Sequence, residues 1–290
     1  MVRVNLLALA GAISLLSTAT FAADLPPPLP PPMVRAPIVE TGGWYLRGDV
    51  GVGMQNFKSF DFTQTNVASG AVWPASWSIR QKDIKDTAFV GFGIGYAWNN
   101  WARFDFTGEY RASSKLKAVG SYSGAADFCP GGTCFDAYDA DHQASVFLAN
   151  AYLDLGTWWC LTPFIGAGAG TAYHKVSALS DTGYIAGSGA SSFGVTQNDR
   201  TQWNFAWALH AGLAYTVSNN LKIEFAYRYL NMGSVPTAEI ICGASGCASG
   251  GGPRAYYTLN NFYSNDFRIG FRWMLQPEQP MYAAPIMRKG

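Results

Sequence analysis

The segment 221–230, LKIEFAYRYL, alternates between apolar side chains and charged or small ones. Side chains of a β-strand point alternately to its two faces, so this segment predicts a strand with one apolar and one ionic face. The apolar face carries aliphatic and aromatic groups, and the ionic face carries charges of both signs. Such a strand separates two different solvents, and the rest of the chain must indicate which solvent lies on which side.

Seven further segments alternate in the same way, and they are joined by turns that are alternately short and long. The predicted strands are about 10 to 15 residues long, enough to cross a bilayer, since a tilted transmembrane strand takes about 9 to 11 residues. With 221–230, the predicted strands are Trp44–Gln55, Thr87–Trp98, Ala102–Arg111, Gln143–Leu155, Pro163–His174, Thr201–Val217 and Phe262–Leu275.

The pattern predicts an all-β fold, an eight-stranded antiparallel up-and-down barrel with four long connections at one end and three short turns at the other. A soluble lipocalin-like barrel also has eight strands, but its apolar face would be the inside. A transmembrane barrel places the apolar face in lipid, the long connections outside the cell and the short turns in the periplasm. The sequence must decide between these two arrangements.

Two features favour the transmembrane barrel. Glycines alternate with the apolar side chains of two strands, where a narrow interior needs room for large neighbours; they are Gly91, Gly93, Gly95, Gly166, Gly168 and Gly170. Aromatic residues gather at both strand ends, as in the girdles at membrane interfaces. They are Trp44, Trp98, Trp101, Trp158, Trp159 and Tyr215 at the short-turn end, and Trp203, Tyr229, Phe262 and Tyr263 at the other.

Composition narrows the class of protein further. The 290 residues include 20 Lys and Arg against 19 Asp and Glu, so no polyanion such as a nucleic acid is expected as a partner. Charged residues make up only 13% and aromatic residues 15%, with 32 glycines, which is unusual for a soluble enzyme.

The two ends of the chain differ from the barrel segment 43–275. Residues 1–22 have a basic start at Arg3, an apolar core and a small-residue ending, which predicts a cleaved signal peptide and export. A membrane anchor is the alternative, but the apolar run is shorter than the roughly 20 residues that a spanning helix needs. Residues 23–42 are a proline-rich linker, and 276–290 form a C-terminal tail; both are expected in the periplasm.

Four of the five cysteines form two close pairs, which we interpret as local disulfides in an oxidising compartment. A zinc site is the alternative, although four residues rather than two separate the members of each pair. The predicted pairs are Cys129 with Cys134 and Cys242 with Cys247, and Cys160 is left over.

The signal peptide before ADLPPP, the opening strand GWYLRGDVGVG, the four long connections and the last strand NDFRIGFRWML resemble a known family. They are similar to the small outer-membrane β-barrel proteins of Gram-negative bacteria, the OmpA-like and opacity-protein group of porin-family surface antigens. The resemblance implies insertion by the outer-membrane assembly machinery, contact with membrane lipids and lipopolysaccharide, and roles in envelope integrity or host contact. Peptidoglycan and an extracellular ligand stay open as further partners.

The ionic faces of four predicted strands supply the first candidate site, inside the barrel. We expect an ion-pair network that fills the lumen, because eight strands leave an interior that side chains just fill. A narrow pore gated by exchange of ion-pair partners is the alternative. The candidate residues are Arg47, Asp49, Arg103, Asp105, Glu109, Arg111, Lys222, Glu224, Arg228, Asp266, Arg268 and Arg272.

Three histidines supply the second candidate. His142 and His174 fall at strand ends next to the long connections, so we expect both at the outer rim, as exposed polar residues. Some proteins of the resembling kind bind haem at the surface, which makes this pair, with Tyr173, a candidate haem or metal contact. His210 alternates with Leu209 and is expected to face the lumen. No catalytic arrangement is present in the sequence, and neither an enzyme nor a cofactor is expected.

Overall fold

The computed structural model describes residues 42–66, 76–123, 133–185, 189–195, 198–242 and 254–275. The expected signal peptide, the tail 276–290 and the linker apart from Gly42 lie outside these ranges. No helix in the described ranges is long and apolar enough to cross a membrane. The strands are β1 (Gly43–Asn66), β2 (Ser76–Ile84), β3 (Thr87–Ala97), β4 (Ala102–Ser123), β5 (Thr133–Asp154), β6 (Leu161–Ile185), β7 (Gly189–Val195), β8 (Arg200–Thr216), β9 (Leu221–Asn231), β10 (Val235–Pro236), β11 (Ile240–Cys242) and β12 (Arg254–Met274).

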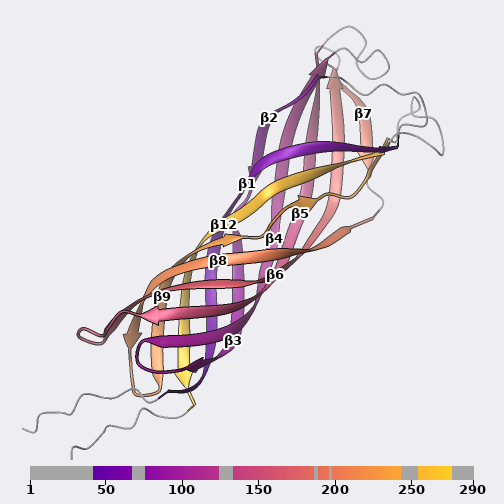
Figure 1. Cartoon of the computed structure of the whole chain (residues 1–290). Helices are drawn as coiled ribbons and strands as arrows, with labels where there is room; N and C mark the ends of the chain where they lie inside the picture. Colours follow the sequence, from indigo (N-terminus) through magenta and orange to yellow (C-terminus); the bar gives the residue numbers. More distant parts are fainter. Residues whose placement is uncertain are drawn as a thin grey trace, which may run out of the picture. The chain divides into compact units, whose positions relative to one another are not determined.

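Eight of these strands close a ring in the order β1-β3-β4-β5-β6-β8-β9-β12, and every pairing is antiparallel (Figure 1). The first and last strands close it, with Tyr45 opposite Met274 and Phe57 opposite Phe262. We call this part the closed ring. It confirms the predicted all-β antiparallel barrel, and each of the eight predicted segments falls largely within one of its strands.

Five of the strands, β1, β4, β5, β6 and β12, continue far beyond the predicted bounds, into segments that were predicted to be connections. β4 and β5 stay paired as far as Ser123 and Thr133, and β1 and β12 as far as Asn66 and Arg254. The prediction that these segments are polar connections between strands was wrong there, because the high polarity hid a continuing alternation. Ion pairs between neighbouring strands explain that polarity, with Lys115 Nζ 2.8 Å from Asp141 Oδ1.

These extensions, together with β2, β7, β10 and β11, form what we call the distal region. Its strands are joined in the order β2-β4-β5-β6-β7-β11-β12-β1, while β10 pairs with β12. β1 pairs with β3 only from Gly43 to Gly53, and no ladder joins β1 to β2 within the described residues. The distal strands therefore have two terminal edges, which belong to β1 and β2 and diverge from each other in Figure 1.

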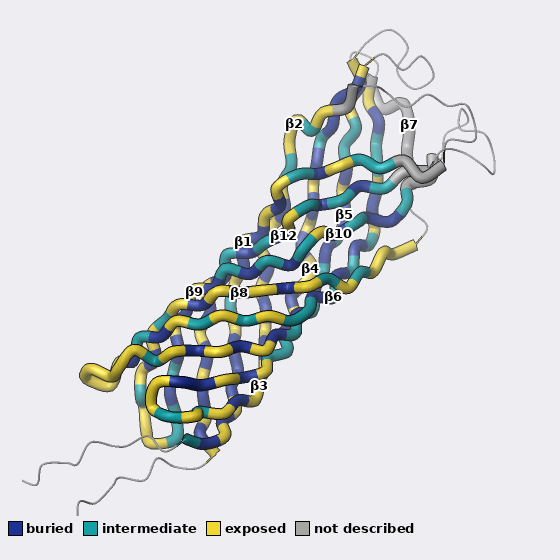
Figure 2. The backbone as a smooth tube through the Cα atoms, viewed as in Figure 1, coloured by how far each residue is buried: buried dark blue, intermediate teal, exposed yellow. Residues whose placement is uncertain are grey.

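Burial separates the two faces of the closed ring (Figure 2). Phe92, Phe205 and Phe225 are 66%, 67% and 52% exposed, although they are large apolar side chains. Lys222, Glu224 and Arg228, which alternate with Phe225 on β9, are all buried. The apolar face is thus outside and the charged face inside, which excludes a soluble barrel with an apolar interior.

Glycines make room for the bulky interior side chains, as the sequence predicted. A Cβ on Gly95 would collide with the ring of Tyr45, and a Cβ on Gly53 would collide with Arg111 and Asp266. One residue of the expected girdle was wrongly placed, because Phe262 is fully buried and points inward, where its ring contacts His142.

Candidate functional site

The interior of the closed ring gathers the twelve charged residues proposed from the sequence. Each of them is at least 92% buried, although they come from four different strands. Burial of a charge without a partner is costly. The ion-pair partners of these twelve residues therefore decide whether the lumen is open or closed. Two ionic clusters lie along the lumen, one towards the distal region and one towards the short turns.

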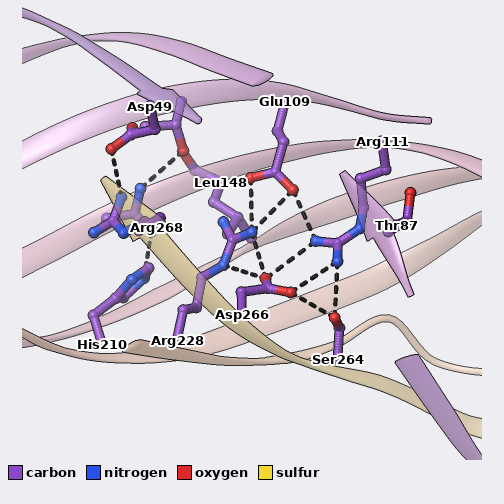
Figure 3. Close-up of polar contacts among 12 residues, drawn as sticks. Asp49, Thr87, Glu109, Arg111, Leu148, His210, Arg228, Ser264, Asp266 and Arg268 are labelled. Carbon is purple, nitrogen blue, oxygen red and sulfur yellow. Dashed lines mark hydrogen bonds and ion pairs between the residues drawn. The ribbon is translucent and has the colours of Figure 1, made fainter. Parts of the chain in front are cut away.

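The first cluster links β4 to β9 and β12 (Figure 3). Arg228 Nη2 lies 2.7 Å from Glu109 Oε2 and 2.6 Å from Asp266 Oδ2. Arg111 lies 2.9 Å from Glu109 Oε1 through Nη1 and 2.8 Å from Asp266 Oδ1 through Nη2. Two guanidinium groups and two carboxylates thus form a closed quartet, in which each group contacts both groups of opposite charge. Ser264 Oγ accepts a further hydrogen bond from Arg111.

The quartet crosses the barrel. In the order of the closed ring, three strands separate β4 from β9 in either direction, so these two strands face each other across the lumen. Contacts between Glu109 and Arg228 therefore span the interior, and a solute would have to separate them in order to pass.

The second cluster lies nearer the short turns. Arg47 contacts Asp105 at 2.6 Å and Asp49 at 2.9 Å, and its Nη1 donates to the hydroxyl of Tyr152 at 2.9 Å. Arg103 of β4 again reaches across to Glu224 of β9, at 3.4 Å. Its guanidinium carbon lies 4.1 Å from the ring centroid of Tyr152. This second crossing closes the lumen a second time.

Three further charged residues belong to the same cluster. Arg272 Nε lies 3.2 Å from Glu224 Oε1, and Arg268 Nη1 lies 3.2 Å from Asp49 Oδ1. Lys222 is also buried and lies opposite Arg272 in the ladder between β9 and β12.

Sequence reasoning missed several residues of this site. Asp154 Oδ1 lies 3.1 Å from Arg103 Nε, and Asn150 donates to Asp105 at 2.8 Å. Both share their face of β5 with Tyr152, so the period of two could have assigned them to the lumen. Tyr45, which donates to Asp105 at 3.1 Å, could have been found on β1 in the same way.

The two histidines expected at the rim lie inside the barrel instead. His142 and His174 are 2% and 0% exposed, with His142 Nε2 3.0 Å from His174 Nδ1. His174 Nε2 lies 3.1 Å from the carbonyl oxygen of Met232, so these atoms form one hydrogen-bonded chain. The expectation of exposure failed because the strands continue past both residues and keep their side chains on the inner face.

Tyr173 does not join this pair. It alternates with His174 on β6 and therefore points outward, where its ring lies 5.0 Å from that of Trp203. The three residues proposed for haem or metal thus lie on two different faces of the barrel wall. Within the described ranges, no group of three or more His, Cys, Asp and Glu side chains is placed to hold a metal ion. His210 faces the lumen, 3.2 Å from Asn150 Oδ1.

The distal region has an apolar interior above the ionic clusters. Phe57, Phe60, Leu116 and Leu259 are all at most 3% exposed and belong to one packed cluster. The rings of Phe60 and Tyr257 stack with centroids 4.7 Å apart. The interior therefore changes from ionic to apolar along the barrel, and this core is a third obstruction to a polar solute.

A pair of carboxylic acids interrupts the distal core. Asp136 of β5 and Asp181 of β6 lie beside Tyr138, whose hydroxyl donates to Asp136 at 3.1 Å and lies 2.6 Å from that of Tyr257. Burial raises the pKa of Asp136 above its usual range. Burial and the neighbouring charge of Asp136 together raise the pKa of Asp181.

The acid pair predicts pH-dependent stability of the distal region. A carboxyl group whose pKa is raised in the folded state contributes stability that is present at acid pH and is lost as the pH rises through the folded-state pKa. We therefore expect faster amide hydrogen exchange in residues 254–262 at about pH 9 than at about pH 5, after correction for intrinsic exchange. Asp181→Asn should remove most of this difference. Equal pH dependence in the wild type and the variant would contradict the assignment.

The cysteine pairs fall largely outside the described side chains. Cys134 lies in β5 and is buried, while Cys129 and Cys247 belong to segments that are not described. Cys160 is exposed in the turn between β5 and β6 and carries a free thiol. The predicted disulfides of the two long connections therefore stay predictions.

Comparison with known proteins gives the family. The model of the outer membrane protein β-barrel domain matches residues 8–274. An uncharacterised protein of Brucella abortus is 33% identical over 224 residues, which cover 71% of each chain. A putative adhesin of Rickettsia prowazekii is 26% identical, with 79% of this chain and 86% of the relative covered.

Two further comparisons concern an outer membrane protein and a solved structure. The outer membrane protein PagN of Salmonella typhimurium is 25% identical, covering 80% of this chain and 89% of its own. The crystal structure of the outer membrane protein OprG from Pseudomonas aeruginosa is similar with a TM-score of 0.47 and 13% identity, covering 81% of this chain and 97% of the other. The extent of the family match, together with the exposed apolar band, shows that this chain belongs to the outer membrane protein β-barrel family.

Proposed function

We propose that this chain is a non-enzymatic outer-membrane protein that contributes to envelope structure and displays its distal region at the cell surface. The observation that carries the proposal is the interior of the closed ring, where Glu109 and Arg103 of β4 contact Arg228 and Glu224 of β9 across the lumen. The apolar core of the distal region lies beyond these contacts. An interior filled in this way offers no passage, so the function belongs to the outer surfaces.

The relatives support a role in surface contact, since one of them is described as a putative adhesin. The proposal includes export through a cleaved signal peptide at 1–22 and insertion by the outer-membrane assembly machinery. It also includes contact of the exposed apolar band with membrane lipids and lipopolysaccharide, disulfides in two distal connections, and recognition of the distal region as a surface antigen.

Conductance tests the closed interior directly. Pure protein in planar bilayers should show no stable conductance of general-porin size, because two ionic crossings and the apolar core obstruct the lumen. Denatured and refolded protein that is checked for heat-modifiable gel mobility provides the control for correct folding. Stable, reproducible channels in the folded preparation would contradict the proposal.

A narrow small-solute channel is the second candidate function, and one observation favours it. Guanidinium N–H groups of Arg103, Arg268 and Arg272 are buried without a hydrogen-bond acceptor at suitable geometry. These N–H groups lie near carboxylates that already pair with other arginines. A carboxylate could therefore change from one arginine to another at a low cost in free energy. Brief, small conductance events that disappear in Arg268→Met, while the fold is retained, would favour this candidate over a permanently closed lumen.

Adhesion tests the surface role. Cells of a non-adherent Gram-negative host that produce this chain should attach to cultured animal cells more than cells that carry the empty vector. The matched control is a chain in which the distal parts of β4 and β5, residues 114–142, are replaced by a short turn. Equal attachment of all three strains would contradict a role of the distal region in contact.

A further inference from the structure

The edge of β2 is a distinctive feature of the distal region. One edge of this strand pairs with β4 from Ser76 to Ile84, and no described residue forms a ladder with the other edge. Figure 1 shows β2 at the border of the distal strands, with β1 turning away from it. A strand edge of this kind presents backbone donors and acceptors to which another extended chain can pair.

Among the described residues of β2, the side chain of Lys82 contacts β1. Lys82 Nζ donates to the carbonyl oxygens of Phe57 at 2.6 Å and of Lys58 at 2.5 Å, and lies 4.7 Å from the ring centroid of Phe57. These bonds use the flexible end of a side chain rather than a backbone ladder. An incoming strand would have to displace these two side-chain contacts, in exchange for a row of backbone hydrogen bonds.

The charges beside the edge select the kind of occupant. Lys58 and Arg80 flank Lys82, and neither makes an ion pair within the described residues. The neighbouring carboxylate of Asp61 accepts hydrogen bonds from Ser59 and Asn260, and its charge also acts on Lys82. Like charges opposite each other destabilise strand pairing, so a second copy of the same edge is disfavoured. Acidic side chains on the face of an added strand that it shares with Lys82 would instead face cations, while Asp83 on the opposite face of β2 disfavours acids there.

The edge is also reachable from water. On the outer face of the neighbouring strands, Lys117 pairs with Asp139 at 3.3 Å, and both side chains are more than half exposed. Charged pairs of this kind lie outside the apolar band that faces lipid. A soluble or cell-surface protein can therefore approach β2 without entering the membrane.

We propose that the free edge of β2 binds an extended, acidic segment of another protein as an added β-strand. The inference rests on the proposed surface role and names the chemistry of the partner: alternating acidic side chains on a backbone with free amide groups. Backbone hydrogen bonds supply the affinity, and Lys58, Arg80 and Lys82 supply the selectivity for acidic segments.

Peptide binding to the full chain in lipid nanodiscs tests this inference. The probe is a fluorescent peptide of alternating glutamate and threonine, compared with the same peptide methylated on alternate backbone nitrogens and with a lysine-threonine peptide. We expect only the first peptide to bind. The double variant Arg80→Glu/Lys82→Glu should weaken it by at least about tenfold. Lys115→Glu/Lys117→Glu, with the same charge change on β4, should weaken it by less than about threefold.

Each other outcome contradicts the inference in a recognisable way. Binding of the methylated peptide, or equal loss in both double variants, would mean general charge attraction rather than strand addition. Dimerisation of the free protein that the peptide does not reverse would mean that the edge takes a second copy. The adhesion assay is independent: failed peptide binding with retained adhesion removes only this inference, and peptide binding without adhesion removes only the proposed surface role.

Discussion

Arg228→Met is expected to lower the free energy of unfolding by about 3–5 kcal/mol, the cost of leaving buried charges without their partner. In the wild type, Arg228 lies within 2.7 Å of both Glu109 and Asp266. Without the guanidinium group, these two carboxylates share Arg111 alone in an interior that excludes water. Urea unfolding in phospholipid vesicles, followed by tryptophan fluorescence, measures the change.

Two variants make this expectation specific. Lys117→Met removes an exposed ion pair with Asp139 and should cost at most about 1 kcal/mol, because solvent screens such pairs. The double variant Arg228→Met/Glu109→Gln should regain a large part of the loss, since Arg111 and Asp266 stay paired at 2.8 Å and no buried charge is left without a partner. A loss of stability in Arg228→Met no larger than that in Lys117→Met would contradict the buried quartet.

Phe225→Arg is expected to destabilise the protein by about 2–4 kcal/mol, the cost of an arginine on the lipid face near the bilayer midplane. Phe225 is half exposed on the outside of β9, between Leu213 of β8 and Ile269 of β12. Its charged replacement would point into hydrocarbon, with no partner within reach on either neighbouring strand. The same vesicle-based unfolding experiment measures the effect.

The matched control is Phe135→Arg in the distal region. Phe135 is also an exposed phenylalanine on a strand, opposite Ser121 and Tyr184. We expect water around it, because the exposed ion pair of Lys117 with Asp139 lies on the same strands, so the change should stay within about 0.5 kcal/mol. Similar losses at both positions would mean that the apolar band does not face lipid.

The alternation of side chains was enough to predict the closed ring and its two faces. On β9, the neighbours Phe225 and Glu224 differ strongly in polarity. The alternation of side chains along a strand therefore assigns Phe225 to the outer face and Glu224 to the inner face. Glycines such as Gly95 could be assigned to the interior because only the opposite face carried bulky groups. These features depend on local geometry, which the sequence encodes directly.

The distal region was missed because its outer face is ionic and its strands resemble polar loops. Lys115 and Lys117 mark a strand only once their partners Asp141 and Asp139 are known to lie opposite. Because the strand was predicted to begin at Gln143, His142 was expected at the rim, although it lies in the interior. Contacts across the lumen, such as Glu109 with Arg228, depend on which strands face each other and cannot be inferred from spacing along the chain.

Spin-label accessibility along β9 tests the central claim that lipid surrounds the closed ring and ion pairs fill it. Labels would be placed one at a time at 221–230 in a chain whose five cysteines are replaced by serine, and probed with lipid-soluble oxygen and a water-soluble nickel chelate. We predict high oxygen accessibility at Phe225 and Tyr227, and low accessibility to both reagents at Glu224, Ala226 and Arg228. High nickel accessibility at Glu224 and Arg228 would show a water-filled lumen and contradict the account.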